Sequence, residues 1–332
     1  MKDQKPPFIY KYVFVKSFDR KIMKFTILGA GGIGGYYAGK LRKAGYGVQL
    51  IARGQQLEMI RSRGLTIVTD DDKFTVTPDV TTDNIKELVP SEVLVIAVKA
   101  DQVKSMLEPI RPLIREATYV ITIQNGVDAY RDLSQMYPGN SLGGLTKVIS
   151  FVDSPGIIRR IGAEAILRFG RADGKKDKTM ENISKAFNDA GINCSISEDI
   201  VKDIWEKFLI MATMGGLGAV TQAPIGVLLS IKEMVDLMDD SMNEIVKIAR
   251  INGITLNDES KNRAWQFFRS LPFGATSSTQ RDVASGKPSE IDYLSGAVAR
   301  MGKEGNVPVP LHSFIDLALK ARELKARGKI DF

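Results

Sequence analysis

The most informative chemistry in this chain lies in the glycine-rich run Gly29-Ala30-Gly31-Gly32-Ile33-Gly34, which has the spacing G-x-G-x-x-G. The run directly follows the strand-like stretch Phe25–Leu28 and precedes a helical stretch, which is the context in which this spacing marks a dinucleotide site. In such a site the first glycine permits the tight turn, the second lets the backbone approach a pyrophosphate, and the third allows close packing of helix on strand. The phosphates would rest on the helix N-terminus. Residues 29–34 are therefore predicted to bind a dinucleotide, with a merely glycine-rich turn as the alternative.

A second position bears on which nicotinamide dinucleotide is bound. About twenty residues after the fingerprint, a site for NAD has Asp or Glu at the end of the second strand, where it accepts from the ribose 2′-hydroxyl. This chain has Arg53 there, after the apolar run Val48–Ala52. A guanidinium can donate charge-assisted, bidentate hydrogen bonds to a 2′-phosphate. We therefore expect NADP(H), with a solvated surface arginine as the alternative.

Polar residues follow two further strand-like runs. Lys99 comes after Val93–Val98, and Asn125 comes after Tyr119–Ile123. Open parallel sheets bind ligands outside the carboxyl ends of their strands. We therefore expect Lys99 near the phosphate or ribose of the cofactor and Asn125 near the nicotinamide ribose or the substrate. For Asn125 an ordinary Asn-Gly turn is the alternative.

The elements that would position these residues change in character near residue 199. Before it, short apolar runs alternate with helical stretches, which is the pattern of βαβ units. The strand runs are apolar on consecutive residues, as expected for parallel strands covered on both faces. After it, long helical periodicity predominates. The sequence thus predicts an α/β fold, with an N-terminal doubly wound Rossmann domain over residues 23–198 and an all-α C-terminal domain over residues 199–332.

Composition narrows the class of protein further. Five lysines interrupt every apolar stretch of residues 1–22, so we expect these residues to be a leader or extension outside the fold. No apolar run approaches the ~20 residues of a membrane span. The net charge of +7 is scattered along the chain, which favours anionic small molecules as partners over nucleic acid or a membrane.

The chain has one cysteine, Cys194, and one histidine, His312. A single cysteine cannot form an internal disulfide, which favours a reducing, cytoplasmic location. No Cys/His cluster exists to hold structural zinc, so we expect no metal. Cys194 is expected to pack in a strand, and His312 to have a structural role near the last helix, with a place in the cleft as its alternative. Acid chemistry would then depend on a lysine or a carboxylate.

Several short motifs together resemble those of the ketopantoate reductases. They are Lys24–Gly34, Ala52-Arg53-Gly54, Val98-Lys99-Ala100, Gln124-Asn125-Gly126, Trp205-Glu206-Lys207 and Ser289–Tyr293. The resemblance extends from about residue 23 to the end of the chain. It implies NADPH-dependent reduction of a 2-keto acid to a 2-hydroxy acid. The family reaction is ketopantoate to pantoate, a step of pantothenate and coenzyme A biosynthesis.

The resemblance also implies roles for three residues of the C-terminal domain. Lys207 matches the family's general acid, Glu290 the glutamate that contacts the reacting hydroxyl, and Ser278 a serine that binds the substrate carboxylate. An ammonium suits the first role, because hydride addition to a ketone builds an alkoxide that a donated proton stabilises. The alternatives are a solvated lysine, a glutamate that favours a helix dipole and an ordinary loop serine.

The chain departs from the family where three asparagines are usual, at Met211, Gly215 and Ile225. Apolar residues cannot replace amide hydrogen bonds to a polar keto acid, so the pocket could serve a less polar or larger substrate. Two other hypotheses remain, a β-hydroxyacid-type dehydrogenase and a non-catalytic NADP(H)-binding sensor. Long apolar helical stretches could support a homodimer.

Overall fold

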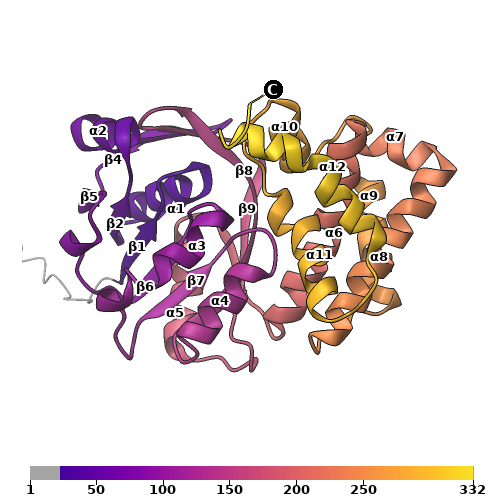
Figure 1. Ribbon diagram of the computed structural model, residues 1–332. Helices are drawn as coiled ribbons and strands as arrows, with labels where there is room; N and C mark the ends of the chain where they lie inside the picture. Colours follow the sequence, from indigo (N-terminus) through magenta and orange to yellow (C-terminus); the bar gives the residue numbers. More distant parts are fainter. Residues whose placement is uncertain (1–22, 332) are drawn as a thin grey trace, which may run out of the picture.

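A computed structural model describes residues 23–331. The segment 1–22, where we expect a leader, lies outside the described residues. The described chain forms a sheet-containing N-terminal domain and a helical C-terminal domain (Figure 1). The predicted combination of a Rossmann-like domain with an all-α domain is thus confirmed. No helix within residues 23–331 is long and apolar enough to cross a membrane.

The central part of the sheet is parallel, as expected for βαβ units. The ten strands have the order β4-β3-β9-β8-β7-β6-β1-β2-β5, with β10 paired to β9. The parallel strands are β5 (Val80–Thr82), β2 (Gly47–Ile51), β1 (Lys24–Leu28), β6 (Val93–Ile96), β7 (Tyr119–Thr122) and the start of β8 (Ser141–Ser154). Their central strands are apolar and buried because helices cover both faces.

The rest of the sheet contains antiparallel pairs that the sequence patterning did not predict. β8 and β9 (Ile157–Gly170) form a long hairpin that turns at Gly156, whose φ is +82°. β3 (Leu65–Val68) pairs antiparallel with β4 (Lys73–Val76) and parallel with β9. β10 (Asn193–Ile196) joins β9 in parallel. The hairpin has register shifts along its length, and these shifts obscure the alternation by which such strands are recognised.

Helices lie on both faces of the sheet. One face packs against α1 (Gly32–Lys43) and α5 (Lys178–Asp189), and the other packs against α3 (Ala100–Leu107) and α4 (Asp128–Met136). α1 also contacts β8, β9 and β3, so the sheet curls around it. Small residues make this possible: a Cβ on Gly39 would lie 2.4 Å from the side chain of Ile67. α1 is thereby held close to β3.

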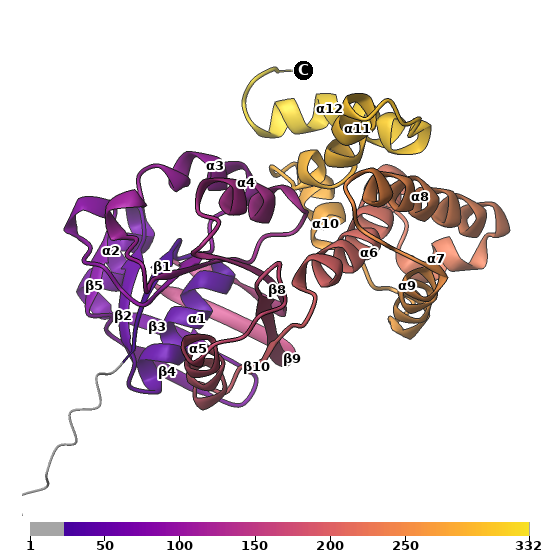
Figure 2. The ribbon, with the colours of Figure 1, turned by 90° about the horizontal axis from the view of Figure 1, so that it is seen from below.

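The C-terminal domain is built around α6 (Ile200–Thr221), which Asp199 caps by accepting from the backbone N–H of Lys202. The surrounding helices are α7 (Ile225–Ser230), α8 (Lys232–Ile251), α9 (Asp258–Ser270), α10 (Ser278–Ala284), α11 (Ser295–Glu304) and α12 (Pro310–Ala326). Glycines of α6 allow close packing, since a Cβ on Gly216 would lie 2.7 Å from Ser295 Oγ. The two domains meet where β8 and α6 lie side by side (Figures 1 and 2).

The one histidine, His312, and the one cysteine, Cys194, are both buried within the fold. The His312 ring is fully buried, with Nδ1 3.1 Å from Ser295 Oγ and Nε2 3.1 Å from Ser241 Oγ, and burial lowers its pKa to about 4. Its backbone N–H donates to Glu244, which caps α12. Cys194 is buried in β10, where burial raises the pKa of the thiol to about 12. Neither side chain is placed for catalysis.

Candidate active site

The glycine fingerprint forms the turn between β1 and α1. Gly29 has a φ of +115°, in a region that side chains disfavour, and a Cβ there would lie 3.0 Å from Ala97 O. Gly31 is the N-cap of α1, and no side chain caps this helix end. A Cβ on Gly31 would meet nothing within 4 Å, so open space lies beside it. The first backbone N–H groups of a helix lack partners within the helix. This turn therefore has the features expected of a pyrophosphate site.

The remaining residues of the run hold the turn in place. A Cβ on Gly34 would lie 2.0 Å from Gly29 O, which explains the third glycine by packing. A Cβ on Gly32 would lie 2.3 Å from Ser150 O of β8, a contact between segments far apart in the sequence. The buried Ala30 accepts from Gln56 Nε2 at 2.9 Å. Ile33 packs against the core of the sheet.

Arg53 lies at the carboxyl end of β2, as predicted. It is the N-cap residue of α2 (Gly54–Arg63), and its side chain is exposed. The carboxyl ends of β1 and β2 are adjacent in the sheet, so the guanidinium is on the same edge as the glycine turn. A dinucleotide that rests its pyrophosphate on α1 would extend its adenosine ribose toward this edge.

The carboxyl ends of β6 and β7 meet a segment of the C-terminal domain. Asn125 Nδ2, after β7, donates to Glu290 Oε2 at 2.8 Å. Lys99, the N-cap of α3 after β6, has an exposed side chain whose Nζ donates to Pro288 O at 3.3 Å. Glu290 itself precedes the short 3-10 helix η3 (Ile291–Tyr293). The structure thus brings together three of the predicted site residues.

Lys207 reaches the same region from α6. Its Nζ donates to Thr146 O of β8 at 3.0 Å. Burial lowers the pKa of Lys207 to about 8, the charge of Glu290 opposes the shift, and Lys147 adds to it. Burial likewise raises the pKa of Glu290, while the hydrogen bond from Asn125 and the charges of Lys207 and Lys99 lower it. Perturbed groups that act on one another are typical of functional sites, and here each of the two also bonds to a residue of the other domain, Asn125 or Thr146.

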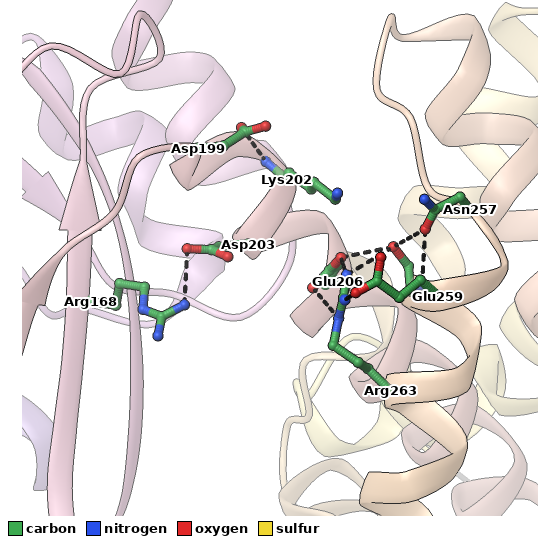
Figure 3. Close-up of polar contacts among 9 residues, drawn as sticks. Arg168, Asp199, Lys202, Asp203, Glu206, Asn257, Glu259 and Arg263 are labelled. Carbon is green, nitrogen blue, oxygen red and sulfur yellow. Dashed lines mark hydrogen bonds and ion pairs between the residues drawn. The ribbon is translucent and has the colours of Figure 1, made fainter.

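The start of α6 is fixed by ion pairs on two sides (Figure 3). Arg263 of α9 donates to both carboxylate oxygens of Glu206, the residue before Lys207. Asp203 accepts from Arg168 of β9 at 3.3 Å. These contacts hold the helix between α9 and the sheet and so set the direction in which the lysine points. The sequence motif contains Glu206, but nothing in it identifies the partner helix.

Ser278 stands apart from the residues described so far. It is the first residue of α10 and is exposed. The neighbouring Ser277 caps the helix, because its Oγ accepts from the N–H of Gln280 at 3.0 Å. α10 packs along α6. No hydrogen bond links Ser278 to Lys207 or Glu290 within residues 23–331.

The three positions that depart from the family differ in their surroundings. Met211 is half-buried on α6, one turn after Lys207. Gly215, one turn further, is buried, and a Cβ there would lie 3.3 Å from Leu294 Cδ1. Ile225 is fully buried at the start of α7, within the helical core. Leu294 thus narrows the space beside Gly215, and Ile225 contributes to packing.

A network from α12 fixes the segment that carries Glu290, and the sequence reasoning missed it. The buried Glu323 accepts from Ser289 N at 3.1 Å and from Ser289 Oγ at 2.8 Å. Arg327 donates to Glu323 at 2.8 Å and reaches across to Asp101 of α3 at 2.7 Å. Glu323 and Arg327 are spaced as an ordinary i,i+4 surface pair, so the pattern gave no reason to single them out.

Comparisons with known proteins agree over both domains. The ketopantoate reductase PanE/ApbA profile matches residues 25–174, and its C-terminal profile matches residues 199–323. The 2-dehydropantoate 2-reductase of Pyrococcus abyssi is 30% identical over 309 residues, which cover 91% of this chain and 98% of the relative. An uncharacterized oxidoreductase of Bacillus subtilis is 28% identical over 293 residues, with coverages of 87% and 95%.

Solved structures extend the similarity to three dimensions. A PanE/ApbA family ketopantoate reductase from Ralstonia eutropha matches with a TM-score of 0.82 and 28% identity, covering 92% of this chain and all of the other. A D-mandelate dehydrogenase, solved with NADH and anilino(oxo)acetate, matches with a TM-score of 0.81 and 23% identity, over 92% of this chain. The second similarity concerns the fold alone.

Proposed function

Because the chain belongs to the ketopantoate reductase PanE/ApbA family of oxidoreductases, we propose that it reduces a 2-keto acid to a 2-hydroxy acid with NADPH. The observation that carries the proposal is the convergence of Lys207, Glu290 and Asn125 at the domain boundary. They lie at the carboxyl edge of the sheet that also carries the uncapped start of α1. Ketopantoate, the substrate named for the family, is the first substrate to test.

In this proposal Lys207 is the acid. NADPH, when bound, supplies the hydride that adds to the keto carbon. The Lys207 ammonium then donates its proton to the oxygen on which negative charge develops. A pKa of about 8 keeps the group mostly protonated at neutral pH and makes its proton easier to transfer than that of an ordinary lysine. Thr146 O orients Nζ.

Glu290 and Asn125 complete the arrangement. Asn125 holds one oxygen of the Glu290 carboxylate at 2.8 Å, which leaves the other oxygen to accept from the hydroxyl that forms. The charge of Glu290 also favours the protonated form of Lys207. The carboxylate would therefore orient the substrate and help to keep the acid charged before each turnover.

The proposed cofactor residues fit NADPH by their chemistry. The helix N-terminus at Gly31 would hold the pyrophosphate, and the exposed Arg53 would hold the 2′-phosphate. Lys99 would lie near the phosphate or ribose, because it follows β6 at the same edge. A ratio of kcat/KM for NADPH over NADH above unity would support this assignment, and a preference for NADH would contradict it.

The experiment for the proposed reaction is substrate-dependent NADPH oxidation by the purified protein across 2-keto acids of differing polarity, with NADP+ reduction by β-hydroxy acids measured in parallel. We expect turnover with at least one 2-keto acid, and a loss of about 10²–10⁴-fold in kcat for Lys207→Met. Lys202→Met removes a lysine from the same helix and serves as the matched control. NADPH binding without any turnover would instead favour a sensor.

A second candidate substrate is a less polar 2-keto acid. The observation that favours it is that the residues after Lys207 on α6 are apolar. Met211 follows Lys207 by one helical turn, and Leu294 packs beside Gly215. These positions offer no side-chain amide to a hydroxylated substrate. A higher kcat/KM for branched or aromatic 2-keto acids than for ketopantoate would support this candidate, and the reverse order would remove it.

A further inference from the structure

A second lysine faces the proposed acid from β8. Lys147 directly follows Thr146, whose carbonyl accepts from Lys207 Nζ. Side chains alternate between the faces of a strand. The Thr146 hydroxyl contacts Tyr37 of α1, so Lys147 projects from the opposite face, toward the C-terminal domain. Its charge is close enough to Lys207 to help lower the pKa of that residue.

The surroundings of Lys147 leave its charge without a counterion. The side chain is exposed, and Nζ lies 5.7 Å from the centre of the Phe267 ring of α9. No carboxylate within residues 23–331 forms an ion pair with it. Ile149, the next residue on the same face of β8, is 56% exposed. Lys147 and Lys207 therefore bring two ammonium groups to the same part of the domain boundary, where the carboxylate of Glu290 acts on Lys207.

We propose that Lys147 binds the carboxylate of the substrate. The inference rests on the proposed function, because a 2-keto acid carries its carboxylate on the carbon next to the keto group. With the keto oxygen at Lys207, the carboxylate must lie a few ångströms away, and Lys147 is the neighbouring cation. Ser278, which the family resemblance suggested for this role, has no hydrogen bond to Lys207 or Glu290 within residues 23–331.

The arrangement also couples substrate binding to the charge of the acid. The positive charge of Lys147 disfavours the protonated form of Lys207. A carboxylate bound at Lys147 would offset its charge, so Lys207 would hold its proton more firmly while substrate is bound. The site would then select anionic 2-keto acids over neutral ketones.

The test compares a 2-keto acid with its uncharged amide in the wild type and in Lys147→Met. We expect the variant to raise KM for the acid by about tenfold or more, to change kcat less, and to lose the preference for acid over amide. Lys147→Arg should keep much of that preference. Lys73→Met removes an exposed lysine from β4 of the same sheet and should change neither constant.

A binding measurement separates this inference from the proposed reaction. Oxamate, a non-reducible 2-oxo anion, is titrated into the protein–NADPH complex and followed by NADPH fluorescence. We expect Lys147→Met to weaken oxamate binding about tenfold and to leave the Kd of NADPH unchanged. Weaker NADPH binding, or an unchanged KM for the acid, would overturn the role of Lys147. Oxamate binding that depends on Lys147 without any keto-acid turnover would overturn the reaction and leave the anion site standing.

Discussion

Replacing Lys207 by methionine should remove activity and, at neutral pH, stabilise the protein. The folded-state pKa of about 8 lies below the ordinary value of 10.5. The difference, 10.5 − 8, is about 2.5 pKa units. At about 1.4 kcal/mol per unit, the protonated Lys207 destabilises the folded protein by roughly 3 kcal/mol at pH 7. Methionine fills a similar volume and carries no charge.

The substitution also removes the hydrogen bond to Thr146 O, which contributes about 1 kcal/mol. The net gain in the free energy of unfolding should therefore be about 2 kcal/mol at pH 7. Lys207→Met would thus be more stable than the wild type while its kcat falls by about 10²–10⁴-fold. Such a gain in stability at the expense of activity is what is expected when a group proposed to be catalytic is removed.

The pH dependence of the stability difference between Lys207→Met and the wild type shows whether the Lys207 charge causes it. Between about pH 8 and pH 10.5 the unfolded chain binds more protons at this residue than the folded chain does. The stability of the wild type therefore rises with pH across that window, relative to the variant. Below pH 8 the destabilising contribution is fully present, and above pH 10.5 it is gone. The advantage of Lys207→Met should shrink from about 2 kcal/mol at pH 7 to about zero at pH 10.

The assay is urea unfolding of both proteins at pH 7 and pH 10, with Lys202→Met as the control for general charge effects. If Lys207→Met raised the free energy of unfolding equally at both pH values, the reasoning would be refuted, because packing rather than charge would then be responsible. A variant less stable than the wild type at pH 7 would show that burying the charged Lys207 ammonium does not destabilise the folded protein. Retained activity would remove it as the acid.

Three further substitutions test the rest of the site. Arg53→Glu should lower the preference for NADPH over NADH at least about tenfold in kcat/KM, and an unchanged ratio would make Arg53 a surface residue. Gly32→Ala should lower the free energy of unfolding in urea by about 1–3 kcal/mol, because the added Cβ would lie 2.3 Å from Ser150 O. An unchanged urea midpoint would contradict that contact. Glu323→Gln should lower the free energy of unfolding by about 1–3 kcal/mol. It should lower kcat more than it raises KM, because it loosens the segment before Glu290. Wild-type kinetics would show that contacts other than those of Glu323 fix the segment.

The parts of the fold that sequence predicts are those with strong local patterns. Buried parallel strands such as β1 and β6 read as continuous apolar runs, and the glycine run marks the start of α1. The β8–β9 hairpin lacks such a pattern, because its outer half carries exposed apolar residues such as Ile149 and Phe151 beside charged ones. Its pairing is fixed by α1 and β3, which lie far away in the sequence.

The same distinction applies to the site. Lys207, Glu290 and Asn125 could be named from short motifs, and the structure places them together. Glu323 and Lys147 could not, because their importance depends on what lies opposite them in space. A buried carboxylate that accepts from a backbone N–H, or a lysine without a counterion, has no sequence pattern of its own.

The positions of Lys207 and Glu290 both depend on how the two domains meet. Lys207 belongs to the C-terminal domain but is oriented by Thr146 of the sheet. Glu290 belongs to the C-terminal domain but is held by Asn125 of the sheet. Arg327 adds a third link through α3. A shift of one domain against the other would therefore move both groups relative to a cofactor fixed on α1. Substitutions at the boundary should act on kcat even where they touch neither substrate nor cofactor, because small displacements of reacting groups are costly to the rate.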